Sequence, residues 1–213
     1  MGKQMVDLKD IRLKAFVKDK TKEALLKVGR KLVVEKGVDA LSARKLATEA
    51  NSSVGMVYNI FGTMDNYIAE QNFITLTELC ERMESIVLGK NPFNNLNRYA
   101  DVFTMYINEN PNLWYLLYCT QLSVSAKRNS LHMAKVIKRI DALVTSQVTI
   151  LVGGIGIKEK KIAIKVLEMS LFSLSGYLLG NTLNLKSDLN RANLCKLLMN
   201  TYVAGLALLK GAK

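Results

Sequence analysis

Apolar residues recur three and four positions apart along almost the whole chain, and no other feature restricts its fold as strongly. This spacing puts apolar side chains on one face of an α-helix, whereas a half-buried strand alternates apolar and polar residues. No convincing alternating stretch occurs, and the 213 residues include only two prolines. A hydrophobic content of 49% is ample for a core. The sequence therefore predicts a folded, all-α protein.

Glycine, asparagine, proline and capping serines divide the chain into about nine expected helices. Ser42 and Ser53 can cap the second and third helices, and Gly37 stands where a left-handed cap would end the first. The fourth helix begins at Thr63 or Asp65 and is broken by a G-K-N-P sequence. With their caps, the expected helices span 21–36, 42–50, 53–61, 63–88, 94–108, 112–123, 126–152, 158–181 and 188–210.

The formal net charge of +12 indicates an anionic partner, either nucleic acid or a membrane surface. Positive charge is denser at the N-terminal end: residues 1–62 hold 13 Lys and Arg against 7 Asp and Glu, whereas residues 63–213 hold 17 against 11. Residues 1–20 are a basic extension that either lengthens the first helix or forms a mobile arm. Two uncharged runs, 142–157 and 169–185, fall short of the ~18 to 20 predominantly apolar residues of a membrane span, so we expect buried helices there.

The three cysteines lie far apart, without a C-x-x-C pair, which argues against a disulfide framework and against a zinc site. Reduced thiols in a cytoplasmic protein are expected. With one histidine and no clustered Cys, Asp or Glu, the chain offers neither a nucleophile with its base nor a metal site. We therefore expect no catalytic residue, metal or cofactor, and an enzyme with a helical pocket remains the alternative.

A segment without any charged residue runs from Ala50 to Met64, inside the basic N-terminal part of the chain. Two short helices joined by a tight turn describe a helix-turn-helix, whose second helix enters the DNA major groove. Residues around the inserted helix grip phosphates, whereas the helix itself reads base edges through hydrogen bonds and apolar contacts. Because those contacts need no formal charge, a neutral helix is compatible with reading bases.

The neutral helix has an expected inner side and an expected outer side. Val57 and Phe61, four positions apart, are expected to pack against Leu46 and Ala47 of the preceding helix. Gly55 costs about 1 kcal/mol of helix propensity relative to alanine, a loss that is rationalised if backbone approaches another surface closely. An ordinary helical hairpin without DNA contacts is the alternative. The residues expected on DNA are Val54, Gly55, Met56, Tyr58 and Asn59.

Residues 41–67 resemble the DNA-binding segment of the tetracycline-repressor (TetR) family of bacterial transcription regulators, and read L-S-A-R-K-L-A-T-E-A-N-S-S-V-G-M-V-Y-N-I-F-G-T-M-D-N-Y. The family pattern runs roughly T-T-x-R-x-I-A-x-x-A-G-V-S-x-G-x-x-Y-x-x-F-x-S-K-E-x-L. The upstream A-L-L-K-V-G-R-K-L-V-V-E-K-G is similar to the family's first helix. The residues that fall on the pattern are Ser42, Arg44, Leu46, Ala47, Ala50, Ser53, Gly55, Tyr58, Phe61 and Thr63.

The resemblance implies a DNA-binding domain at 21–67 and a helical ligand-binding and dimerisation domain at 68–213. It also implies a cytoplasmic homodimer that binds a near-palindromic double-stranded DNA operator, releases it on binding a small effector, and acts by repression. A basic helical protein bound to a membrane surface is the alternative. The residues that the resemblance turns toward phosphates or bases are Ser42, Arg44, Ser53 and Tyr58.

The chain departs from the family pattern at two places. Asn51 and Ser52 replace the usual Gly-Val turn. Met64 occupies the position where a lysine normally reaches a phosphate, and the loss of one phosphate contact flattens the salt dependence of binding by roughly 0.9 units. Lys45 or the basic extension is expected to offset this loss.

The segment Glu168 to Asn181 is nearly free of charge and carries small residues along one edge, which lets two helices approach closely. With the final helix it is expected to form a four-helix dimer interface, as members of the family commonly do. A core helix of a monomer is the alternative. The residues expected at the dimer interface are Ser173, Gly176, Gly180, Leu194, Leu197, Leu198, Tyr202 and Leu206.

A ligand pocket is expected among the fifth to eighth helices, where large apolar and aromatic residues are frequent. Such a lining suits an apolar or aromatic effector, and ordinary core packing is the alternative. The expected lining residues are Phe103, Met105, Tyr106, Trp114, Tyr118, Met133, Phe172 and Tyr177.

Overall fold

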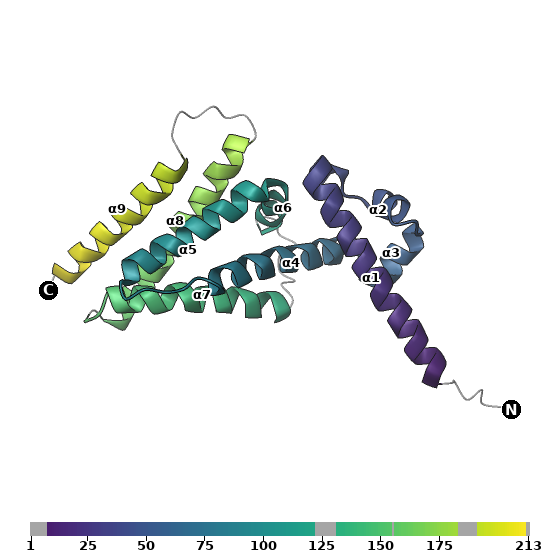
Figure 1. Cartoon of the computed structure of the whole chain (residues 1–213), viewed down its shortest axis with the longest axis horizontal. Helices are drawn as coiled ribbons and strands as arrows, with labels where there is room; N and C mark the ends of the chain where they lie inside the picture. Colours follow the sequence, from purple (N-terminus) through teal and green to yellow (C-terminus); the bar gives the residue numbers. More distant parts are fainter. Residues whose placement is uncertain (1–7, 122–130, 155, 183–190, 212–213) are drawn as a thin grey trace. The chain divides into compact units, whose positions relative to one another are not determined.

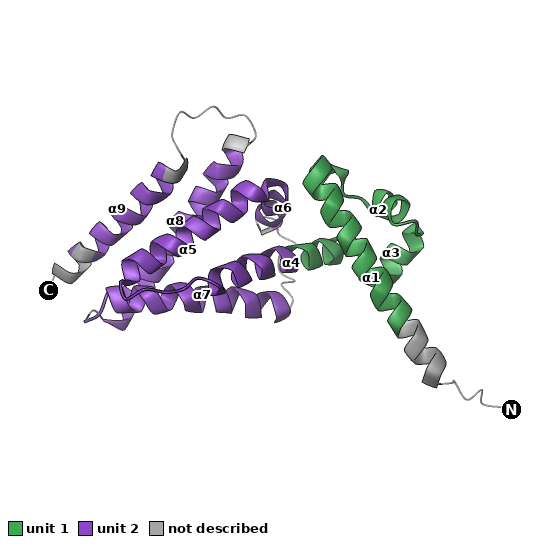
Figure 2. Cartoon of the chain, in the orientation of Figure 1, with its two compact units in different colours: residues 1–72 green, residues 73–213 purple. Residues whose placement is uncertain are grey.

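The computed structural model describes residues 8–121, 131–154, 156–182 and 191–211, which form helices and connections but no strand (Figure 1). The chain divides into two compact units, residues 1–72 and 73–213 (Figure 2). The sequence placed its domain boundary after Tyr67. The expected all-α class is confirmed for the described part of the chain.

Nine α-helices and one short 3-10 helix follow one another in the described residues, close to the expected spans. Their bounds are α1 (Leu8–Lys36), η1 (Val38–Ala40), α2 (Ala43–Glu49), α3 (Val54–Phe61), α4 (Met64–Glu84), α5 (Pro92–Glu109), α6 (Pro111–Gln121), α7 (Leu131–Leu151), α8 (Ile157–Thr182) and α9 (Arg191–Gly211).

The first helix is longer than expected. It begins at Leu8 rather than Thr21, so the described part of the basic extension lengthens α1. Leu25 and Val33 are buried, whereas Ala24 is exposed. Gly37 follows the last turn with a φ of 80°, a backbone conformation that glycine adopts without steric cost.

The helices α2 and α3 pack on α1 around one apolar cluster in the first unit (Figure 1). Leu46 of α2 is fully buried, and the ring of Phe61 meets the ring of Tyr67 edge to face at 4.8 Å between centroids. Edge-to-face contacts of this kind add about 0.5–1.5 kcal/mol beyond burial of the rings. The start of α4 is thereby fixed against the end of α3.

The fourth helix ends at Glu84, earlier than the expected Leu88. Beyond it, the Asn95 side chain accepts a hydrogen bond from the Gly89 N–H at 2.8 Å and donates one to the Gly89 carbonyl at 2.9 Å. These bonds satisfy the backbone N–H and C=O groups of Gly89, which in a continued helix would bond within the helix. The helix therefore ends before Gly89.

The fifth helix begins at Pro92, earlier than the expected Asn94. The Asn91 side chain accepts hydrogen bonds from the backbone N–H groups of Phe93 and Asn94 at 2.9 and 3.2 Å. Proline suits the first helical position because its missing N–H would have no partner there. Proline opens α6 in the same way at Pro111.

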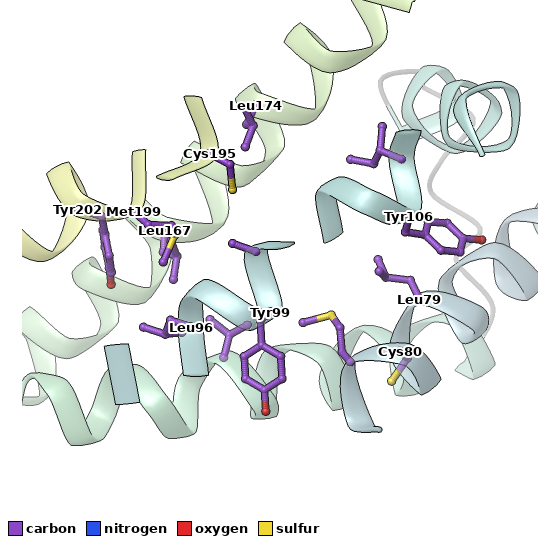
Figure 3. Close-up of a cluster of buried hydrophobic side chains, with 14 of the residues drawn as sticks. Leu79, Cys80, Leu96, Tyr99, Tyr106, Leu167, Leu174, Cys195, Met199 and Tyr202 are labelled. Carbon is purple, nitrogen blue, oxygen red and sulfur yellow. The ribbon is translucent and has the colours of Figure 1, made fainter. Parts of the chain in front are cut away.

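The helix α5 lies against α7, α8 and α9 in the second unit, and its inner residues form the centre of a large core (Figure 3). Leu96 and Tyr99 of α5 are almost fully buried there, as is Met199 of α9. Asn95 donates a buried hydrogen bond to the Gln147 side chain of α7 at 2.9 Å, so this polar pair is satisfied inside the core.

The helix α8 contains the one described segment that is long and apolar enough to cross a membrane, Ile157–Gly180, with a mean hydropathy of 1.5. Only 33% of its most apolar window is buried, whereas we expected a helix buried on most sides. The exposed apolar residues on this helix include Ile162, Val166 and Met169.

Candidate DNA-binding and ligand sites

Two serines cap the helices of the expected helix-turn-helix. The Ser42 side chain accepts a hydrogen bond from the Lys45 backbone N–H at 3.3 Å, and the Ser53 side chain accepts one from the Met56 N–H at 3.1 Å. Both serines have extended backbone angles, as N-cap residues do. The two helix starts expected from the sequence are therefore present.

The turn between α2 and α3 is closed by the backbone. The Ser52 N–H donates to the Ala47 carbonyl at 2.8 Å, and the Asn51 N–H donates to the Thr48 carbonyl at 3.2 Å. Asn51 has a φ of 48°, and it is the one non-glycine residue with a positive φ in the described part of the chain. Asparagine tolerates this left-handed conformation better than most residues, which explains how Asn51 and Ser52 replace a Gly-Val turn.

The two sides of α3 differ as expected. Val57 and Phe61 are 1% and 6% exposed and pack into the cluster of the first unit. The side chains of Val54, Met56 and Tyr58 are 40%, 39% and 46% exposed, and no charged residue lies on the helix. Asn59 is also exposed. An uncharged, partly apolar surface is thus presented to solvent.

Gly55 lies on the exposed side of α3 with no near neighbour. A Cβ atom placed there would meet its nearest atom outside the helix backbone, Ser53 Oγ, at 3.8 Å. No packing in the described part of the first unit therefore requires a glycine. The propensity lost at this position is not recovered within those contacts.

Cations stand at α2 rather than on α3. Arg44 and Lys45 are exposed, and Ser42 is half-buried. Among ion pairs of the described residues, Lys36 reaches Glu49 of α2 at 3.2 Å between charged atoms. Arg44 and Lys45 are in no ion pair of the described residues, so both are available to an anionic partner.

Met64, at the position of the family's lysine, is half-buried and packs against the cluster of the first unit. The start of α4 is held by other residues. The Thr63 hydroxyl accepts a hydrogen bond from the Asn66 backbone N–H at 3.1 Å, and the Asn66 amide donates to the Phe61 carbonyl at 2.8 Å.

Sequence reasoning missed the joint between α1 and α4. The Tyr67 hydroxyl donates to the Leu25 carbonyl at 2.9 Å, and the Gln71 amide donates to the Tyr67 hydroxyl at 2.8 Å and to the Leu26 carbonyl at 2.7 Å. A Cβ on Gly29 would overlap the Tyr67 hydroxyl. The i, i+4 spacing of Tyr67 and Gln71 could have predicted that their side chains meet on one helix face. It could not predict the contact with Gly29, which is far away in the sequence.

Burial raises the pKa of Tyr67 to about 12, against the smaller opposing effect of the Gln71 hydrogen bond. The phenol therefore stays protonated, and keeps its hydroxyl available to donate, throughout the ordinary pH range.

A cavity of ≈ 210 Å³ lies inside the second unit, between residues of α4 to α9. Four expected pocket residues line it: Phe103, Trp114, Tyr118 and Phe172. The aromatic rings pair, with Phe103 edge-on to Trp114 at 5.2 Å and Tyr118 stacked on Phe172 at 4.8 Å between centroids.

The other expected pocket residues lie elsewhere. Tyr106 and Met133 are buried in the core, Met105 is 57% exposed, and Tyr177 lines a shallow groove between α8 and α9. Tyr106 donates its hydroxyl to Glu78 at 2.8 Å. Phe103 and Tyr106 both belong to α5, but Phe103 lines the cavity whereas Tyr106 is buried in the core.

The residues expected at the dimer interface differ in their exposure and in their contacts within the chain. Leu194, Leu198 and Ser173 line the exposed grooves of α8 and α9, as does Leu197, which is 63% exposed. Gly180 is half-buried.

Three other expected dimer residues have contacts inside the chain. A Cβ on Gly176 would approach the Tyr118 hydroxyl to 2.6 Å, so this glycine packs against α6. Tyr202 is 8% exposed and donates its hydroxyl to the Ala163 carbonyl at 2.9 Å, and Leu206 is 5% exposed. Both residues also line the groove between α8 and α9.

The described residues contain no group of three or more His, Cys, Asp or Glu side chains that could hold a metal ion. Cys80, Cys119 and Cys195 are free. Burial raises the pKa of the Cys80 and Cys195 thiols, which keeps these thiols protonated and unreactive at neutral pH.

Residues 25–70 match the family model for bacterial regulatory proteins of the tetR family. A search of curated protein sequences found no match. The matched residues include both capped helices and Tyr67, so the match covers α2, α3 and the start of α4.

Solved structures share the fold over most of both chains. A protein of unknown function from Rhodococcus sp. RHA1 aligns with a TM-score of 0.69 at 17% identity, covering 88% of this chain and 95% of its own. A tetR-family transcriptional regulator from Streptomyces coelicolor aligns with a TM-score of 0.68 at 15% identity, covering 91% and 83%. A TetR family transcriptional regulator from Thermus thermophilus aligns with a TM-score of 0.58 at 17% identity, covering 84% and 97%. Residues 25–70 are therefore similar to the bacterial regulatory proteins of the tetR family, and the chain shares the fold of solved transcriptional regulators of that family.

Proposed function

We propose that the protein is a ligand-responsive transcriptional regulator, a repressor that binds a near-palindromic operator as a cytoplasmic homodimer. One observation carries the proposal. Val57 and Phe61 fix one side of α3 against the first unit, and the opposite side is exposed and uncharged beside the cations of α2. A helix held in this way suits the major groove, where bases are read without formal charge.

The roles of the α2 and α3 residues follow from their chemistry. Arg44 and Lys45 grip phosphates, with Ser42 and Ser53 beside the helix starts that also attract anions. Asn59 and Tyr58 form hydrogen bonds to bases or phosphates, and apolar Val54 and Met56 contact base edges such as a thymine methyl group. Gly55 lets the backbone come close to DNA. Packing within the first unit gives no other reason for a glycine at this position, since no neighbour there needs its small size.

Dimerisation uses the exposed apolar face of α8 and α9. Ile162, Val166 and Met169 of α8 are 50%, 48% and 61% exposed, and Leu197 of α9 is 63% exposed. A contiguous apolar surface of this kind marks an interaction site on a protein of this size. The same face on a second copy completes a two-fold interface. The two copies of α3 then read half-sites about 34 Å apart, which is one turn of DNA.

The cavity of the second unit binds the effector. Its walls are apolar and aromatic, as in small-molecule sites. An effector that binds the DNA-free conformation better than the DNA-bound one lowers operator affinity. A dimer on a promoter excludes polymerase, so deletion of the gene is expected to raise expression from the controlled promoter.

Selection of bound DNA from random duplexes tests the proposal directly. The expected result is a two-fold symmetric site whose half-sites lie one helical turn apart. A protein that binds all duplexes equally, or none, contradicts it.

Paired variants then locate the residues that touch DNA. Asn59→Ala should change the selected base preference, whereas Asn94→Ala, at an exposed asparagine of the second unit, should not. Arg44→Ala should weaken binding to every sequence and flatten the salt dependence by about 0.9 units for each phosphate that the arginine neutralises. A salt slope unchanged by Arg44→Ala would remove this residue from the interface.

A further inference from the structure

We propose that the cavity of the second unit selects an aromatic organic cation, recognised by the carboxylates of Asp141 and Glu168. The inference rests on the proposed function only in naming the effector class, since binding can be measured without DNA. Asp141 belongs to α7 and Glu168 to α8, and both line the cavity.

The charge of the lining has one sign. Asp141 and Glu168 are its charged residues, and no Lys, Arg or His of the described chain lines the cavity. An anionic ligand such as a fatty acid would therefore place its carboxylate among apolar side chains and two further carboxylates. Like charges brought together in an apolar site are disfavoured, whereas a cation is favoured.

The two carboxylates differ in how far they are already neutralised. Glu168 is paired with Lys165 at 2.9 Å between charged atoms, and this lysine is 70% exposed at its side chain. Asp141 has no ion-pair partner among the described residues. Burial raises the pKa of Asp141, the charge of Glu168 adds to this, and Lys165 opposes it. Asp141 is thus the acid that gains most from a cationic partner.

The remaining walls fit a flat ring system. Phe103 with Trp114, and Tyr118 with Phe172, supply two aromatic pairs from three helices, α5, α6 and α8. Aromatic faces attract organic cations as well as apolar rings. A cavity of about 150 Å³ holds one benzene ring, so ≈ 210 Å³ suits a ligand of about two fused rings.

Three matched naphthalene compounds test the proposal on the full-length protein by isothermal titration calorimetry. They are 2-naphthylmethylammonium, the neutral 2-naphthylmethanol and the anionic 2-naphthoate. The ammonium compound is expected to bind at least about tenfold more tightly than the alcohol, and the naphthoate more weakly than both. Equal affinities, a preference for the anion, or no binding of the ammonium compound would each overturn the proposal.

Variants assign the selectivity to the two acids. Asp141→Asn combined with Glu168→Gln keeps the shape of both side chains and is expected to reduce the preference for the cation to less than about threefold. Glu81→Gln, at an exposed acid of α4 that does not line the cavity, should leave the preference unchanged. Circular dichroism confirms that each variant is folded. A folded double variant that keeps the full preference contradicts the assignment.

A gel shift with the selected operator separates this inference from the proposed function. Operator binding without selective cation binding overturns the inference and leaves the regulator intact. Selective cation binding by a protein that recognises no DNA sequence supports the cavity and overturns the regulator. Cation binding that releases the operator supports both.

Discussion

The helices α3 and α8 both expose apolar side chains, but they do so in opposite electrostatic surroundings. The helix α3 is short, capped at Ser53, uncharged, and follows the exposed cations of α2. The helix α8 is long, and its acid Glu168 joins Asp141 at an apolar cavity while its outer side exposes Val166 and Met169. Apolar surface thus suits different partners according to the charges beside it. We propose DNA at α3 beside cations, a second copy at the exposed face of α8 and α9, and an organic cation in the cavity beside two acids.

The largest effect is expected from a charge placed on the outer face of α8 and α9. Leu197→Lys should break the proposed dimer, because an ammonium group would have to be desolvated in the interface. Operator affinity should fall at least about 100-fold, or about 2.7 kcal/mol. Sedimentation and gel shift measure the two results. Leu131→Lys, at a 70% exposed leucine of α7, is the matched control and should change neither. A dimeric Leu197→Lys protein would place the interface elsewhere.

The next effect compares two glycines that each face a tyrosine hydroxyl. Gly29→Ala should destabilise the protein by about 2–3 kcal/mol, because Tyr67 is fully buried and hydrogen-bonded to Leu25. Gly176→Ala should cost less than about 1 kcal/mol, since the half-buried Tyr118 can move its hydroxyl. Urea denaturation measures both. Equal losses would show that the two contacts are equally rigid.

A smaller effect, of opposite sign, is expected at Gly55. Gly55→Ala should stabilise the first unit by up to about 1 kcal/mol, because alanine gains helix propensity and its Cβ meets no atom outside the helix backbone closer than 3.8 Å. If the backbone at Gly55 approaches DNA, the same variant should bind the operator more weakly. Thermal denaturation and gel shift give the two measurements. A more stable variant with unchanged DNA binding would remove Gly55 from the interface.

The last effect is seen only at alkaline pH. The pKa of Tyr67 is raised to about 12, above the ordinary value of 10.0, so the native state holds its proton more tightly than the unfolded chain. Its contribution is complete below pH 10 and is lost as the pH rises toward 12. Tyr67→Phe should remove part of this loss, and cost about 1 kcal/mol at neutral pH through the missing hydrogen bonds. Denaturation at several pH values measures both. If the stability of Tyr67→Phe falls between pH 10 and 12 as steeply as that of the unchanged protein, the pKa of Tyr67 is not raised by folding.

The helix-turn-helix was predictable from sequence because its determinants are local. Ser42 and Ser53 bond to backbone groups three residues on, and Val57 and Phe61 share a face because they are four residues apart. The expected pocket was less predictable. Tyr106 and Trp114 both belong to apolar helices, yet Trp114 lines the cavity whereas Tyr106 bonds to Glu78 in the core.

The sequence by itself determined the all-α class, the two capped helices and the neutral side of α3, since each depends on residues within about one helical turn. Only the tertiary structure decided that Gly29 meets Tyr67, that Gly176 meets Tyr118, and that Asp141 joins Glu168 at one cavity. These pairings join residues far apart in the chain, and helical periodicity fixes which side of a helix is apolar without fixing what that side will touch.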